Sequence, residues 1–124
     1  MKKQSATVEA LKKASRGLMM PSESDAAFTP FEWADGGELT GERLLQLAHE
    51  PKGSAVEEDT LDNLFRTVPA EDRAKFQALA KAVQEQLTGI KVYKVGDEAE
   101  RSVYIVGKNK DGQWAGLKTS VVET

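Results

Sequence analysis

The chain has no cysteine, only one histidine, four prolines and few aromatic residues, which make up 6% of the sequence. Without cysteine there is no disulfide framework, thiol nucleophile or cysteine-ligated metal site. No apolar run approaches the roughly 18 residues of a membrane-spanning helix. The basic start, MKKQS, is not followed by the apolar segment of a signal peptide. These absences predict a cytoplasmic protein that does not contact a membrane.

What the chain does contain fits one globular domain, which we expect to cover residues 1–124. The apolar share is 40% and the mean hydropathy is −0.48. Single domains commonly have about 100–150 residues. A chain of this length can bury one hydrophobic core without disulfides or structural metals.

The net charge of −3 is distributed in blocks of different sign. Residues 1–17 carry five bases and one acid, net +4, and residues 22–62 carry two bases and eleven acids, net −9. Residues 63–124 carry ten bases and eight acids, net +2. Nucleic acid requires a basic footprint, so the acidic middle argues against direct binding of DNA or RNA. It suits a basic protein partner, and a solvated face is the plainer alternative.

Apolar spacing predicts helices over residues 5–16, 40–50, from about 59 onward, and 69–87. The aromatic segment 28–33 is predicted to be an edge strand because Pro30 cannot donate a ladder hydrogen bond. Three further strands are expected in IKVYKVG, SVYIVGKN and WAGLKTSVV, which are rich in β-branched and aromatic residues. Residues 103–106 are all apolar, so their strand should be buried on both faces. That burial predicts three layers, with helices on each side of the sheet.

No catalytic constellation is visible in the sequence. His49 is the only histidine, it stands beside Glu50, and no serine is marked as its partner. The stretch ADGGEL lacks the Gly-Lys-Ser/Thr ending of a phosphate-binding loop. The acidic stretch VEEDTLD lacks the alternating ligands of a calcium loop and is expected to begin a helix. The sequence therefore predicts a protein that is not an enzyme and has no cofactor of its own.

The acidic insert Ser22-Glu23-Ser24-Asp25 interrupts apolar sequence between LMMP and AAFTPFEW. The plainer interpretation is a Ser/Asx turn that joins a helix to a strand. The functional interpretation is an exposed carboxylate that reaches a partner's metal, because magnesium prefers hard oxygen ligands. The chain end, SVVET, offers a second anionic group directly after a strand, at Thr124.

These segments resemble the nuclease A inhibitor family, whose members block sugar-non-specific bacterial nucleases. One matching block is LKKASRGLMMPSESDAAFTPFEW, and the other runs from AKFQALAKAVQEQL to the terminal Val-Val-Glu-Thr. The most specific parts are the Ser-Glu-Ser insert and the last four residues. The preceding segment RTVPAEDR is shorter than in the family pattern. A protein with this fold that binds another protein or a small ligand is therefore the alternative.

The resemblance implies an α+β fold in which helices sandwich a four-stranded, mixed, largely antiparallel sheet, as in plant pathogenesis-related proteins of group one. It also implies that Glu23 ligates the catalytic Mg²⁺ or Mn²⁺ of a non-specific endonuclease, with help from Thr124. Ser22 and Ser24 would hold the turn through local hydrogen bonds. The carboxylate of Asp25 would make the electrostatic potential around the turn more negative. The metal in this scheme belongs to the nuclease.

Overall fold

The computed structural model describes residues 6–20, 25–33, 37–66, 68–96 and 99–122. Its helices are α1 (Ala6–Ser15), α2 (Gly41–Leu47), α3 (Leu61–Phe65), the 3₁₀ helix η1 (Ala70–Asp72) and α4 (Arg73–Gln86). Its strands are β1 (Met19–Met20), β2 (Ala26–Ala27), β3 (Thr29–Glu32), β4 (Val56–Asp59), β5 (Thr88–Val95), β6 (Glu100–Lys108) and β7 (Trp114–Val122). None of the helices in these described ranges is long and apolar enough to cross a membrane.

The main sheet has five strands in the order β3-β7-β6-β5-β4, and β1 and β2 form a separate two-stranded sheet. All four neighbouring pairs of the main sheet are antiparallel. The α+β class is therefore confirmed, whereas the expected four-stranded mixed sheet is wrong. The additional strand is β4, whose sequence VEED was expected to begin a helix. The likeness to group-one pathogenesis-related proteins stays a prediction.

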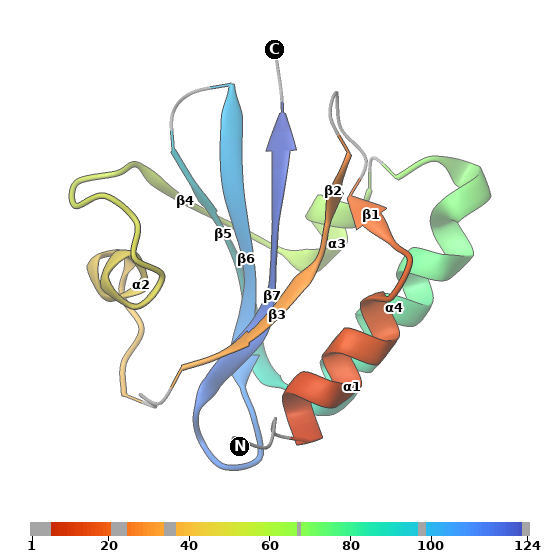
Figure 1. Cartoon of the computed structure of the whole chain (residues 1–124), viewed down its shortest axis with the longest axis horizontal. Helices are drawn as coiled ribbons and strands as arrows, with labels where there is room; N and C mark the ends of the chain where they lie inside the picture. The colour runs from red at the N-terminus through yellow and green to blue at the C-terminus, as the bar shows by residue number, and fades with distance from the viewer. Residues whose placement is uncertain (1–5, 21–24, 34–36, 67, 97–98, 123–124) are drawn as a thin grey trace.

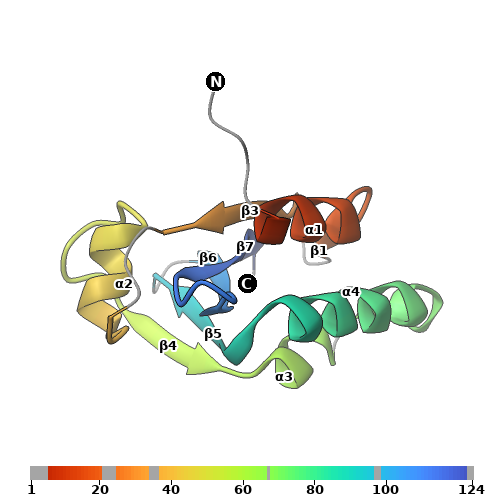
Figure 2. The ribbon, with the colours of Figure 1, turned by 90° about the horizontal axis from the view of Figure 1, so that it is seen from below.

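Helices lie on both faces of the sheet, with α1, α3 and α4 on one face and α2 on the other (Figures 1 and 2). On the first face Leu11 and Leu79 belong to the same core as Ile105. On the second face Leu44 packs in a smaller core with Tyr104. The side chains of residues 103–106 are 0–2% exposed, so β6 is buried on both faces as predicted. The helix/sheet/helix layering follows from that burial.

The helix boundaries follow from their capping residues. Thr40 and Thr60 cap α2 and α3, because each side-chain oxygen accepts a hydrogen bond of 3.1 Å from the backbone N–H three residues later. Pro69 precedes η1, which leads directly into α4. Gly17 follows α1 with φ of +79°, a conformation that glycine adopts without steric cost. This cap turns the chain from α1 into β1.

The smaller core is rich in aromatic rings. Phe31 stacks on Trp33 with 4.4 Å between ring centroids, and its ring meets Tyr104 edge-on at 6.1 Å. Trp33 and Trp114 pack against this core. The Tyr104 hydroxyl donates a short hydrogen bond to the carboxylate of Glu50. Burial of its hydroxyl raises the pKa of Tyr104, and the hydrogen bond to Glu50 raises it further.

The acids of β4 are paired with bases of β5 and β6. The carboxylate of Glu57 lies 3.0 Å from the Arg101 guanidinium. Asp59 and Glu58 each lie 3.6 Å from a lysine amine, of Lys94 and Lys91 respectively. Much of the negative charge in this stretch is thus compensated locally, and β4 contributes little net field to the surroundings.

Asp59 is expected to make stability depend on pH below its ordinary pKa of 3.8. Burial alone would raise the pKa, but hydrogen bonds from Thr60 N–H and the Asn63 amide, both 2.8 Å, and the charge of Lys94 lower it overall. The carboxylate therefore stabilises the fold above pH 3.8, and this contribution is lost as pH falls through the folded-state pKa. Asp59→Asn should lower the free energy of unfolding by about 1 kcal/mol at pH 7.

Urea unfolding of both proteins between pH 7 and pH 2.5 would measure this effect. The difference between wild type and Asp59→Asn should shrink as the pH falls below 3.8. A difference that stays constant over the whole range would contradict the assignment to the Asp59 carboxylate. Glu58→Gln is the matched control, because its ion pair with Lys91 is more than half exposed and should contribute little.

Candidate functional site

The β1–β2 hairpin, residues 19–27, carries the acidic insert that was singled out in the sequence. Met20 pairs with Ala26 and Met19 with Ala27, so residues 21–25 connect the two strands. Asp25, the described residue of this connection, is exposed. Ser22, Glu23 and Ser24 lie outside the described residues. Their predicted roles therefore depend on how the flanking strands are held.

Both ends of the hairpin are fixed in the main core. On β1, Met20 is 2% exposed and belongs to the same core cluster as Leu11 of α1. After β2, Phe28 is buried, and its ring centroid lies 6.1 Å from that of Phe76 in α4. The strands that flank the insert are thus anchored to α1 and α4. Such anchoring lowers the entropy that a binding loop would lose on complex formation.

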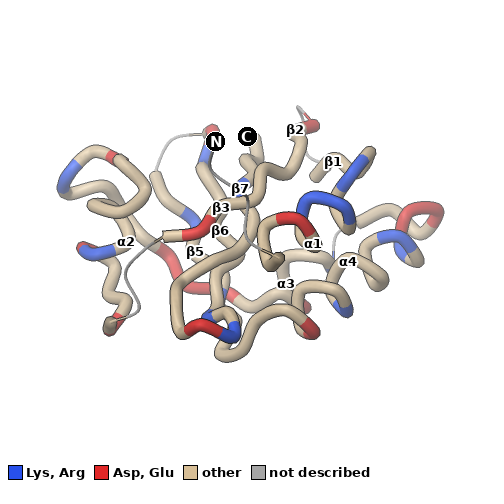
Figure 3. The backbone as a smooth tube through the Cα atoms, turned by 60° about the horizontal axis from the view of Figure 1, so that its bottom comes forward, with Lys and Arg blue, Asp and Glu red and all other residues tan. Residues whose placement is uncertain are grey.

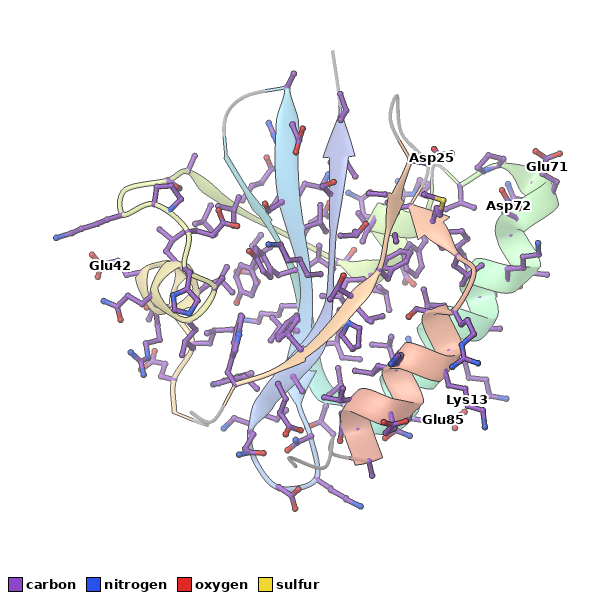
Figure 4. The ribbon with its side chains drawn as sticks, viewed as in Figure 1. Lys13, Asp25, Glu42, Glu71, Asp72 and Glu85 are labelled. Atoms are coloured by element: carbon purple, nitrogen blue, oxygen red, sulfur yellow. The ribbon has the colours of Figure 1, made fainter. Side chains whose placement is uncertain are left out.

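A hydrogen bond ties the hairpin to the last strand of the sheet. The hydroxyl of Thr119, a buried residue, donates to the carbonyl of Ala26 over 3.2 Å. The strand that carries Thr119, β7, ends at Val122, two residues before Thr124, which lies outside the described residues. In Figure 1 the tip of β7 and the β1–β2 hairpin lie at the same end of the molecule, and Figure 4 labels Asp25 there. The described flanks of both predicted site segments are therefore neighbours.

Removing the Thr119 hydroxyl should loosen the hairpin without emptying the core. In Thr119→Val the shape is kept, but the Ala26 carbonyl loses its donor, and we expect the free energy of unfolding to fall by about 1–2 kcal/mol. Hydrogen exchange should quicken at the amides of β1 and β2 more than at those of β5. Thr119→Ser, which keeps the hydroxyl, is the control. Equal exchange in Thr119→Val and wild type would show that the bond does not hold the hairpin.

Elsewhere in the described part of the chain, no group of three or more histidines and acids is arranged to hold a metal ion. His49 is exposed directly after α2, with φ of +58°.

Sequence reasoning overlooked two residues of the hairpin region, Thr119 and Met19. The exposure of Met19 could have been expected, because successive residues of a strand face opposite sides and Met20 is buried. Nothing local in the sequence links Thr119 to Ala26.

Together these features define a small α+β protein that holds a hairpin with an acidic connection at the end of its last sheet strand. The family model described as nuclease A inhibitor-like protein matches residues 5–124, so the chain belongs to this family. The resemblance found in the sequence is thereby confirmed. No curated protein matches the chain. Membership of the family implies a non-catalytic inhibitor whose partner is a nuclease.

Proposed function

We propose that the protein is a cytoplasmic inhibitor of a metal-dependent, sugar-non-specific endonuclease. In this proposal the carboxylate of Glu23 occupies the catalytic Mg²⁺ or Mn²⁺ of the nuclease, and Thr124 lies beside it. The main structural support is the Thr119–Ala26 hydrogen bond, which joins the strands leading to both residues. The chain itself would need no metal, because the metal belongs to the partner.

The chemistry of the target explains why an acidic hairpin would block the active site. A nuclease cleft that accepts a polyanion is basic and holds a hard divalent cation, for which oxygen ligands are preferred. A carboxylate on that cation would exclude both the scissile phosphate and the attacking water. Negative charge on the inhibitor would also accelerate encounter with the basic cleft.

The supporting residues of the insert would contribute orientation more than affinity. Ser22 and Ser24 would form local side-chain-to-backbone hydrogen bonds that fix the direction of Glu23. Asp25 is exposed next to the described start of β2 and would add to the field near the metal. The acids of β4 are paired with bases, so they would contribute less to this attraction than the acids of the hairpin connection.

Inhibition can be tested directly with purified sugar-non-specific, magnesium-dependent endonucleases. The protein is mixed with each nuclease in Mg²⁺, and cleavage of plasmid DNA is followed over time. The expected result is stoichiometric inhibition of at least one nuclease, together with weaker binding when the metal is removed by a chelator. Full cleavage by every nuclease at a large molar excess of the protein would reject the proposal and favour the alternative, a binding protein for another partner.

A further inference from the structure

A groove of about 400 Å³ lies between the last turn of α1 and the β1–β2 hairpin. Its apolar lining comes from Leu18, Met19, Ala27 and Phe28, and its polar rim includes Lys12 and Arg16. The groove is open to solvent and is bordered by Met19 and Ala27, a cross-strand pair of the hairpin. It is therefore a part of the surface that any partner bound to the hairpin would approach.

Met19 is the most unusual residue of this groove. Its side chain is 49% exposed, and within the described ranges it is the only large hydrophobic residue exposed to this extent. The alternation of β1 directs Met20 into the core and leaves Met19 outside. A single exposed apolar residue is ordinary on a protein surface. In a groove, however, a flexible thioether can adapt its shape to an incoming side chain, as methionines of binding surfaces do.

The rim of the groove is positively charged and uncompensated. Lys12 lies in the last turn of α1, and Arg16 directly follows the last residue of this helix. Both are exposed, and neither forms an ion pair with a described residue. Figure 3 shows the positive charges of α1 in its last turns, next to β1. The helix dipole favours cations at this end. It does not supply a counter-ion for either side chain.

We propose that this groove receives an apolar side chain and a neighbouring carboxylate of the nuclease, from a segment outside its active site. The inference rests on the proposed inhibition, because the groove would be occupied by the same partner as the hairpin. A stable interface buries about 800 Å² on each partner, more than a five-residue connection supplies. The groove extends the contact surface directly from the hairpin.

The opposite charges of hairpin and groove would also fix the orientation of the complex. The acidic insert would be attracted to the basic, metal-loaded cleft, whereas Lys12 and Arg16 would be repelled by it and would require an acidic patch beyond its rim. Complementary charge of this kind determines register and encounter rate more than it determines affinity. The groove would thus select among nucleases that share the same catalytic metal site.

The test compares inhibition constants and association rates for a nuclease that the wild-type protein inhibits. Met19→Ala should weaken inhibition about tenfold, chiefly by faster dissociation, as expected for a buried interface anchor. The double variant Lys12→Glu/Arg16→Glu should weaken inhibition at least about tenfold by faster dissociation, because the proposed carboxylate of the nuclease would then face like charges, with less effect at high salt. The matched control is Lys13→Glu, because Lys13 is an exposed lysine of the same helix that does not line the groove. Figure 4 labels its position.

The possible outcomes separate this inference from the proposed function. If the wild-type protein inhibits a nuclease and the groove variants behave like Lys13→Glu, the groove is not part of the interface and the inference fails alone. If the groove variants lose affinity and Lys13→Glu does not, the inference is supported. If the wild-type protein inhibits no nuclease, both the proposed function and the inference are overturned. Circular dichroism of each variant must first show an unchanged fold.

Discussion

Glu23→Gln should raise the inhibition constant for the target nuclease about a thousandfold. The substitution keeps the size of the side chain but removes the negative charge that would bind the metal. Loss of one partner from a desolvated charge pair costs about 2–5 kcal/mol. A value of about 4 kcal/mol, in the upper half of this range, corresponds to roughly a thousandfold change in affinity. Plasmid cleavage at increasing inhibitor concentration gives the constant.

Asp25→Asn is the matched control for Glu23→Gln, since it removes a carboxylate from the same connection. Asp25 is assigned only a contribution to the field, so this variant should lose less than about tenfold. Deletion of Thr124 should weaken inhibition to an intermediate degree, because the deletion leaves the Glu23 carboxylate in place. Retention of full inhibition by Glu23→Gln would disprove the metal-blocking mechanism even if the protein inhibits the nuclease by another route. Thermal unfolding of all three variants should match that of the wild type.

Gly116→Ala should be the most destabilising small substitution in the sheet. A Cβ atom at this position would lie 1.7 Å from the carbonyl oxygen of Ile105 in the neighbouring strand. The obstacle is backbone, so no side-chain rotation can relieve the overlap, and β6 and β7 would have to separate. We expect a loss of about 4 kcal/mol or more, which is exceptionally large for a single substitution. Denaturation in urea, followed by tryptophan fluorescence, measures the loss.

Gly41→Ala is the appropriate control for Gly116→Ala. At Gly41 the nearest atom to an added Cβ is Cβ of Val56 at 3.7 Å, an ordinary contact, and the residue is the first of α2. Alanine is a better helix former than glycine, so the variant should be at least as stable as the wild type. Similar stabilities of the two variants would contradict the close approach of β6 and β7 at Gly116.

The strands of the C-terminal third were predictable because they are rich in β-branched and aromatic residues. The run of apolar residues from 103 to 106 indicated a strand buried on both faces, and these side chains are indeed buried. The strand β4 was not predictable, because VEED has neither apolar alternation nor high strand propensity. Its partners are bases on other strands, such as Lys94 and Arg101, and such non-local pairing leaves no mark on the local sequence. The missing strand made the expected sheet one strand too small.

The residues proposed for the candidate site were chosen from the sequence, whereas the positions of the strands that flank them could not be predicted from it. The acidic insert and the terminal residues stood out because their composition differs from that of the apolar sequence around them. The described flanks of these two segments are held together by Thr119 and Ala26, which are 93 positions apart in the sequence. The two-residue strands of the hairpin are also too short to produce a periodic pattern. Family resemblance supplied the link between insert and chain end that local reasoning could not.

The direction of β7 has a practical consequence for experiments on this protein. Because β7 ends beside the hairpin, an affinity tag or a surface-immobilisation handle fused after residue 124 would stand where the nuclease is proposed to dock. Helix α1 begins at the other end of the molecule, far from the tip of β7 (Figure 1). Tags and fluorophores belong on the N-terminal side, and a negative result obtained with a C-terminally tagged protein should be repeated after the tag has been cleaved off.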